Sequence, residues 1–405
     1  MQWSSFAYSD SVKQKLVQGY EGNYNEVKYQ HIYLRPSGAL HASPNEMARF
    51  VRMMLNNGSL DGQSIIADSL LSRMQTPTTT LAAKHGFKYG YGLGISHSET
   101  QGYPNYNHGG GISGFISKYM YFPDYDLGFV LLVNSTAAFN DIEQRVTRFL
   151  LRDVPKPDPT PPVDLSKEQF SAFEGYYMNE SPRNQLFAPL DMILGGLTMS
   201  VTNDTLHSSG FMETPTALLP VSDYQFRKAG QTKAATIFMN TDTYGLTMQH
   251  GGDFYIKTGS WKKYVYRGAF FGGLGILATF VLFSLCWIPL EIYRKFSAER
   301  SPFAYQQLFW WPFGALLSIA LLVGAITQLS IMQLGYPTIP AVLVMVATYL
   351  FGIASVGSLW TSLRSWQKNI HRLMSGYFSL VAITLVGFTL FFIYAHWMGL
   401  QLWAY

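Results

Sequence analysis

The chain has 405 residues, of which 48% are hydrophobic, 16% aromatic and only 13% charged, whereas about 25% of the residues of a typical soluble domain are charged. The net charge is only +4, and no basic run with interleaved aromatic residues occurs, so nucleic acid is not expected as a partner. The single cysteine, Cys286, excludes an internal disulfide and a cysteine zinc site. Histidines do not recur at metal-binding spacings, so we expect neither a metal nor another cofactor.

Residues 1–154 are predicted to form an α+β segment. A helix is expected after Ser43, because Ser43-Pro44-Asn45-Glu46 has the pattern of a capping box, and Gly58 is expected to end it. The other expected elements are helices over 69–74 and 140–152 and strands over 89–95, 116–122 and 127–134. The last two strands should form an antiparallel hairpin through the turn at 123–126.

A proline-rich linker is expected over 155–164, because five prolines within 155–162 can continue neither a helix nor a central strand. After it, residues 165–260 show short strand patterns separated by turn signals. These patterns predict a small antiparallel barrel or sandwich. The expected strands cover 173–178, 197–201, 224–228, 235–240, 246–250 and 254–257.

Residues 261–405 are predicted to form a transmembrane domain, because no Asp, Glu, Lys or Arg occurs between Ser301 and Leu363. Four apolar stretches reach the roughly 20 residues that cross a bilayer, and the lipid bilayer is therefore an expected partner. They cover about 268–290, 308–330, 339–363 and 373–395. A large buried helical core is the alternative, but buried core helices usually have shorter uncharged runs.

Loop charges predict the orientation of these helices, because Lys and Arg are retained on the cytoplasmic side. Six of these residues lie in the first and third connections: Arg294, Lys295, Arg300, Arg364, Lys368 and Arg372. The second connection and the C-terminal tail have none, although Lys262, Lys263 and Arg267 precede the first helix. The charges favour a multi-pass protein of the cell membrane with its soluble domains on the extracytoplasmic side.

The motif most informative about chemistry is Asn107-His108-Gly109-Gly110-Gly111. Three consecutive glycines beside an imidazole let the backbone approach a ligand and leave N–H groups free to stabilise an oxyanion. A glycine-rich turn with a surface histidine is the alternative interpretation.

Together with its flanking segments, this motif resembles the serine β-lactamase and penicillin-binding-protein superfamily, in particular its class C-like esterase and D-amino-peptidase branch. Residues 1–6 (MQWSSF) are similar to the family's LGM-x-x-T-S-F, residues 35–50 to P-A-G-G-L-x-S-T-x-x-D-L-A-R-F, and residues 89–94 (YGYGLG) to Y-G-L-G-W. The resemblance implies that His108-Gly109-Gly110 is the H-x-G strand of the acyl site and that Gly111 supplies an oxyanion N–H. It also implies a small-molecule substrate: a peptidoglycan-like D-amino-acid peptide, a β-lactam or a small ester.

The chain departs from this family where the nucleophile should be. The S-x-x-K and Y-x-N motifs precede the segment that matches residues 1–6, so we expect this chain to hold only the C-terminal half of the hydrolase domain and to be inactive as given. We also expect the sequence upstream to supply a signal segment and both motifs within about 150 to 250 residues. Similar letters elsewhere, at 8–10, 257–259, 260–263 and 365–368, are interpreted as chance matches.

Two functions remain open from the sequence. The first is a membrane-anchored serine hydrolase that acts through an acyl-enzyme. The second is a non-catalytic membrane sensor, transporter or binding protein that carries a hydrolase remnant. The scarcity of charged residues within the four apolar stretches favours the first, because transport usually needs paired charges or broken helices there. The oligomeric state is not predicted.

Overall fold

The computed structural model describes residues 4–22, 24–29, 35–296, 303–329, 335–368 and 370–404. It divides into two compact units: Met1–Pro182 with Gly195–Gly259, and Arg183–Leu194 with Ser260–Tyr405. The predicted fold class is confirmed, since the chain has an α+β part, a closed antiparallel barrel and four long apolar helices. Some residues used in the sequence analysis lie outside the described ranges: 1–3 of the segment MQWSSF, Arg300, and 331–334 of the second helix connection.

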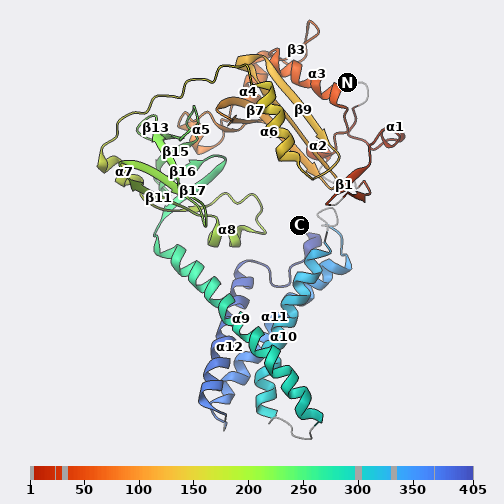
Figure 1. Cartoon of the computed structure of the whole chain (residues 1–405), viewed down its shortest axis with the longest axis vertical. Coiled ribbons are helices and arrows are strands. Elements are labelled where there is room, and N and C mark those ends of the chain that lie inside the picture. The colour runs from red at the N-terminus through yellow and green to blue at the C-terminus, as the bar shows by residue number, and fades with distance from the viewer. Residues whose placement is uncertain are drawn as a thin grey trace. The chain divides into compact units, whose positions relative to one another are not determined.

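A five-stranded antiparallel sheet forms the centre of the α+β part (Figure 1). Its strands follow chain order: β5 (Gly90–Tyr91), β6 (Ser96–Thr100), β7 (Tyr103–Ile112), β8 (Phe115–Phe122) and β9 (Leu127–Val133). The predicted hairpin of β8 and β9 is confirmed, with a 3-10 turn over Pro123–Tyr125. Two short hairpins accompany the sheet: β1 (Gly19–Glu21) with β2 (Asn25–Val27), and β3 (Ser59–Leu60) with β4 (Gln63–Ser64).

Helices cover both faces of this sheet because its strands alternate apolar residues to the two sides. On one face, α3 (Pro44–Leu55) and α4 (Asp68–Gln75) bury Val51, Met54 and Leu71 with Tyr121. On the other face, α6 (Phe139–Leu150) lies along the strands, and Leu150 and Leu151 pack with Met120 and Phe122. The shorter helices are α1 (Asp10–Lys13), α2 (Arg35–Gly38) and α5 (Leu81–Lys84).

The predicted cap of α3 forms on the serine side. The Ser43 hydroxyl accepts a hydrogen bond from the Glu46 N–H at 3.3 Å. The buried Glu46 carboxylate accepts a hydrogen bond from the Ser4 hydroxyl at 2.7 Å, so it ties the start of α3 to the N-terminal segment.

The strand predicted over 89–95 is wrong after Tyr91, because glycines turn the chain there. Gly94 has φ +75°, and the Gly92 N–H donates to the Ile95 carbonyl at 2.8 Å. A Cβ on Gly92 would lie 2.1 Å from the Met74 carbonyl oxygen, so this loop packs backbone against backbone. The chain re-enters the sheet at β6, which the sequence did not predict.

The all-β part is a closed eight-stranded barrel, β10 to β17, paired in chain order with β17 closing on β10. Its strands are β10 (Gly175–Asn179), β11 (Leu197–Thr202), β12 (Thr205–Ser209), β13 (Thr216–Pro220), β14 (Gln225–Lys228), β15 (Thr236–Thr241), β16 (Gly245–His250) and β17 (Asp253–Thr258). Six were predicted, and β12 and β13 were missed. Phe173, at the end of α7 (Lys167–Phe173), packs with Phe226 and Phe238 in a core that fills the interior.

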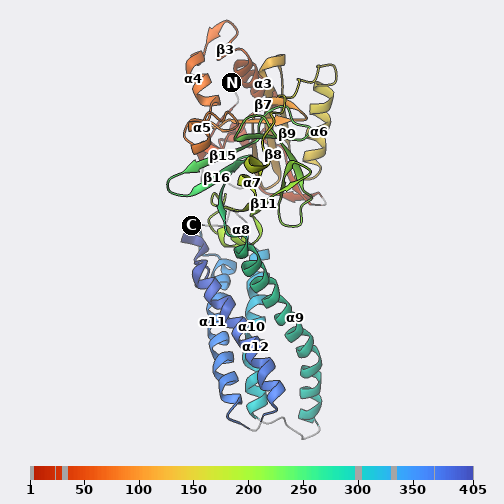
Figure 2. The same ribbon diagram turned by 90° about the vertical axis from the view of Figure 1, so that its left-hand side faces the viewer.

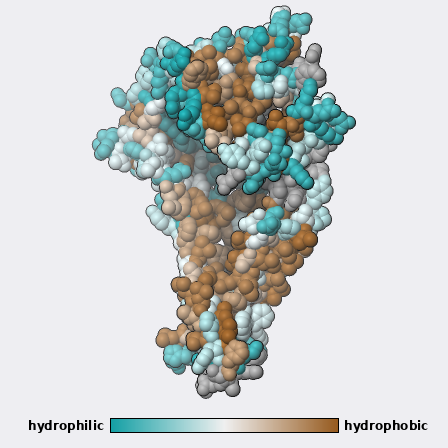
Figure 3. Space-filling view, turned by 45° about the vertical axis from the view of Figure 1, so that its right-hand side comes forward, coloured by the Kyte–Doolittle hydropathy of each residue, from teal (hydrophilic) through white to brown (hydrophobic). Residues whose placement is uncertain are grey.

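The four predicted apolar stretches are helices long and apolar enough to cross a membrane (Figure 2). They are α9 (Trp261–Phe296), α10 (Phe303–Thr327), α11 (Ile339–Ser365) and α12 (Arg372–Tyr394), followed by a 3-10 turn over Leu402–Ala404. The hydrophobic surface over these helices in Figure 3 is consistent with contact with lipid.

A short segment between β10 and β11, Arg183–Leu194 with α8 (Ala188–Leu194), belongs to the helical unit. The Arg267 guanidinium of α9 donates a hydrogen bond to the Ile193 carbonyl at 3.0 Å. The Trp397 indole donates to the Leu186 carbonyl at 2.8 Å. The helical unit therefore includes a segment that precedes α9 by more than sixty residues.

Candidate functional site

The predicted site residues His108 to Gly111 lie in the second half of β7. This strand pairs with β8 along its whole length, from Tyr106↔Tyr121 to Ile112↔Phe115. It pairs with β6 only up to Asn107. In the described part of the chain, no strand pairs with the other edge of β7 beyond that residue. Gly109, Gly110 and Gly111 are exposed.

The direction of the glycine N–H groups follows from the turn between β7 and β8. Ile112 and Phe115 close a two-residue turn, and such a closing pair is normally hydrogen-bonded. Since hydrogen-bonded and non-hydrogen-bonded pairs alternate along an antiparallel ladder, the N–H groups of Gly109 and Gly111 should point away from β8. This half of β7 therefore offers backbone donors at an open edge.

His108 is half-buried and held by tyrosines. Its Nε2 lies 2.6 Å from the Tyr91 hydroxyl, and the tautomer of the imidazole decides which of the two donates this hydrogen bond. Tyr119, its cross-strand partner, stacks on the imidazole with a ring separation of 6.5 Å. Burial, together with the neighbouring Tyr91, raises the pKa of Tyr119 to about 12, so this phenol stays protonated at neutral pH.

An aromatic row continues from His108 across the same face of the sheet. Tyr106 stacks on Tyr121 at 5.4 Å and on His97 at 4.4 Å, and His97 stacks on Tyr89 at 4.6 Å. Burial lowers the pKa of His97, which favours its neutral form. This row could not be predicted from the sequence, because its members come from strands whose register was unknown.

The opposite face of β7 carries an amide network that fixes the strand beside β6. The Asn107 amide donates to the Ser98 hydroxyl at 2.9 Å and to the Asn105 carbonyl oxygen at 2.8 Å. The Asn105 amide donates in turn to the Thr100 hydroxyl at 3.0 Å. The paired half of β7 is thus rigidly placed next to its open half.

The turn after β7 contacts the N-terminal hairpin. The Ser113 hydroxyl donates a hydrogen bond to the Glu21 carboxylate. Gly114 has φ +77°, and a Cβ there would lie 3.1 Å from the Gly19 backbone, so only glycine lets these two segments approach this closely. The contact between Glu21 and Ser113 could not be predicted, because a carboxylate and a hydroxyl 92 residues apart show no local pattern.

None of the similar motifs elsewhere belongs to the sheet that contains β7. Lys257 belongs to β17 of the barrel, where its ammonium donates to the Ala172 carbonyl at 2.8 Å. Ser260 precedes α9 in the helical unit. Ser365 ends α11, is 1% exposed and donates to the Ser362 carbonyl at 2.6 Å. Ser9 flanks the short helix α1.

Among the described residues, no group of three or more His, Cys, Asp or Glu side chains could hold a metal ion. The groups around β7 that could take part in chemistry are backbone N–H groups, the His108 imidazole and phenols. Such groups can orient a carbonyl substrate and stabilise negative charge on its oxygen.

Comparisons with known proteins relate the first part of the chain to a known family. Residues 1–151 match the family model described as Beta-lactamase. Similar solved structures include the octameric penicillin-binding protein homologue from Pyrococcus abyssi, which is 17% identical over 64% of this chain and 57% of that one, with a TM-score of 0.32. They also include SurE, 18% identical over 60% and 55% of the two chains (TM-score 0.32), and SurE with D-Leu, 19% identical over 54% and 50% (TM-score 0.31). This chain thus spans about half the length of these proteins. No curated protein matches it.

Proposed function

We propose, from the membership of residues 1–151 in the serine β-lactamase and penicillin-binding-protein superfamily, that His108 to Gly111 line one wall of an acyl-transfer site. The observation that carries the proposal is the open edge of β7 next to an imidazole held by Tyr91. The substrate class is a D-amino-acid peptide, a β-lactam or a small ester. In this role the Gly111 N–H donates to the oxygen of the reacting carbonyl.

The chain as given should form no acyl-enzyme, because Ser260 and Ser365 do not lie in the sheet that carries His108. Incubation of the chain with a fluorescent penicillin or a fluorophosphonate should therefore leave it unlabelled. A covalent adduct on either serine would refute this part of the proposal.

The wall itself can be tested in a form extended at its N-terminus by a segment with S-x-x-K and Y-x-N. Gly111→Pro removes the N–H at the open edge, whereas Gly111→Ala keeps it, and a Cβ there has no atom within 4 Å. Gly111→Pro should slow acylation by about 10² to 10³, the usual cost of one oxyanion donor, and Gly111→Ala should slow it much less. Equal rates in both variants would contradict the role of this N–H.

We also propose that the soluble parts and the C-terminus lie on the extracytoplasmic side, supported by the six basic residues of the first and third helix connections. In a Cys286→Ser background, single cysteines at the exposed Gly110 and Gln401 should both react with an impermeant maleimide on intact cells. Labelling of only one of them would refute the topology.

A further inference from the structure

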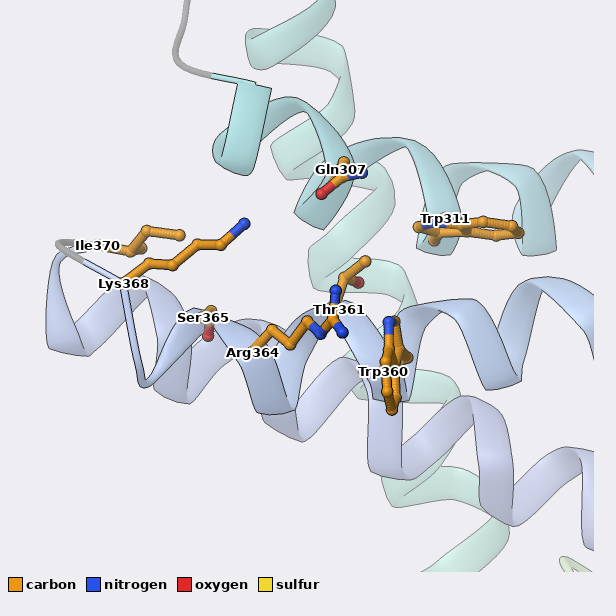
Figure 4. A pocket seen from close by; sticks show the side chains of 8 residues that line it. All are labelled: Gln307, Trp311, Trp360, Thr361, Arg364, Ser365, Lys368 and Ile370. Carbon is orange, nitrogen blue, oxygen red and sulfur yellow. The ribbon is translucent and has the colours of Figure 1, made fainter.

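The helical unit contains a pocket of about 220 Å³ between α10 and α11 (Figure 4). Its polar rim has Arg364, Lys368 and Gln307, and its apolar wall has two partly exposed indoles, Trp311 and Trp360. The pocket is unrelated to the candidate acyl site, which belongs to the other unit.

The two cations at the rim are available to a ligand. Among the described residues, no carboxylate forms an ion pair with Arg364 or Lys368. The Arg364 guanidinium lies over the Trp360 ring at 4.3 Å, which orients it but leaves its N–H groups free to donate. Two cations that form no ion pair with a described carboxylate favour an anion at this pocket.

The depth of the pocket along the helices indicates a membrane interface. The 27 residues of α11 are about 40 Å long, which exceeds the roughly 30 Å of a hydrocarbon core. Arg364 lies in the last turn of α11 and Lys368 just beyond it, while Trp360 lies one turn further in. Charged groups outside and indoles inside match the order of headgroup and acyl-chain boundary.

The apolar wall of the pocket is held in place by close packing. A Cβ on Gly357 would lie 2.3 Å from the Trp311 ring, so this glycine seats the indole of α10 against the backbone of α11. The C-terminal end of α11 opposes an anion, but its dipole amounts to about half a charge, against two full positive charges.

We propose that this pocket binds the phosphate-bearing headgroup of an anionic membrane lipid. The phosphate would lie between Arg364 and Lys368, the Gln307 side chain would face the polar headgroup, and the first methylenes of an acyl chain would lie along Trp311 and Trp360. Basic pockets between helices at the membrane surface suit such lipids, because a cation near the surface favours an anionic headgroup and the chain remains in apolar surroundings.

Native mass spectrometry of the full chain, released from nanodiscs of phosphatidylglycerol and phosphatidylcholine, tests the proposal. Phosphatidylglycerol should stay bound to the unchanged protein in preference to phosphatidylcholine. Arg364→Gln with Lys368→Gln should weaken its apparent affinity about 25-fold, from about five-fold per cation. The matched control, Lys295→Gln with Arg372→Gln, removes the same charges from exposed positions near the same helix connections but outside the pocket, and should change affinity less than about three-fold.

Two results would overturn the proposal. One is equal loss of phosphatidylglycerol from both double variants, which would show only general attraction to basic loops. The other is occupancy by inorganic phosphate or glycerol 3-phosphate at the same concentration as the lipid, which would identify a site for a free phosphate. Thermal unfolding of each variant in detergent verifies that the compared proteins are folded, and Trp311→Ala should weaken lipid binding while both cations remain.

Discussion

Replacing Glu99 by alanine should loosen the turn between β14 and β15 of the barrel. The Glu99 carboxylate, on β6, accepts hydrogen bonds from the N–H groups of Thr232 and Lys233 at 3.0 Å and from the Thr232 hydroxyl at 2.8 Å. Thr232 is only 1% exposed, so water cannot readily replace the lost acceptor there. Lys233 is exposed, and water can satisfy its N–H after the substitution.

The expected cost is about 2 to 3 kcal/mol, mostly from the buried Thr232 N–H, because a buried group without its charged partner costs about that much, whereas the Thr232 hydroxyl can still donate to the Gly102 carbonyl at 3.3 Å. Amide hydrogen exchange in peptides covering 229–236 should accelerate about 30- to 150-fold at constant temperature and pH. Glu99→Gln keeps one acceptor oxygen and should accelerate it less. Peptides from β8 serve as the internal reference. Unchanged exchange at 229–236 in the alanine variant would refute the assignment of this carboxylate as the clamp of the turn.

Three further predictions concern the same unit. Burial lowers the pKa of His250 to about 4, from about 6.5 in an unfolded chain, so protonation favours unfolding. The contribution of His250 to stability is therefore complete above pH 6.5 and falls by up to about 3 kcal/mol as the pH drops toward 4. His250→Gln should make the thermal unfolding temperature less dependent on pH across this range. Gly114→Ala should lower the free energy of chemical unfolding by about 1 to 3 kcal/mol, because a φ of +77° is strained for alanine and the new Cβ would contact Gly19. Gly62→Ala, also at positive φ but with no atom near its Cβ, should lower it less. Phe238→Ala removes a side chain that is 1% exposed and stacked on Phe173, and should lower the free energy of unfolding by about 3 to 5 kcal/mol, with Tyr224→Ala, which is half-exposed, as the milder comparison.

The helical unit was the part of the fold most readily predicted. A long uncharged apolar run seldom occurs outside membrane-spanning helices, and all four expected stretches are helices. The missed barrel strands show the opposite case. β12 reads Thr205-Leu206-His207-Ser208-Ser209 and β13 ends in Pro220, so neither shows the run of β-branched or aromatic residues that marks a strand. Their partners along the barrel, not their own propensity, make them strands.

Of the candidate site, only the glycine-rich strand segment could be predicted from the sequence. Three glycines after a histidine signalled a segment open to a ligand, and their strand is part of the sheet. The partners of that histidine could not be predicted, because Tyr91 ends β5, and a two-residue strand shows no alternating pattern that would indicate its register. Glu21 follows Tyr20, which forms an isolated parallel bridge with Ser135 after β9, so its contact with Ser113 depends on distant parts of the chain.

The segment Arg183–Leu194 makes the order of synthesis matter for this protein. It is translated before any of the four long helices, yet the Leu186 carbonyl receives its hydrogen bond from Trp397, 211 residues later. The strands of the barrel can pair while this segment still lacks the helices that it contacts. The contact with Trp397 can form only after α12 has been synthesised. A fragment that ends at Gly259 would therefore carry an apolar excursion with nothing to cover it, and it should aggregate more readily than a fragment in which residues 183–194 are replaced by a short polar turn.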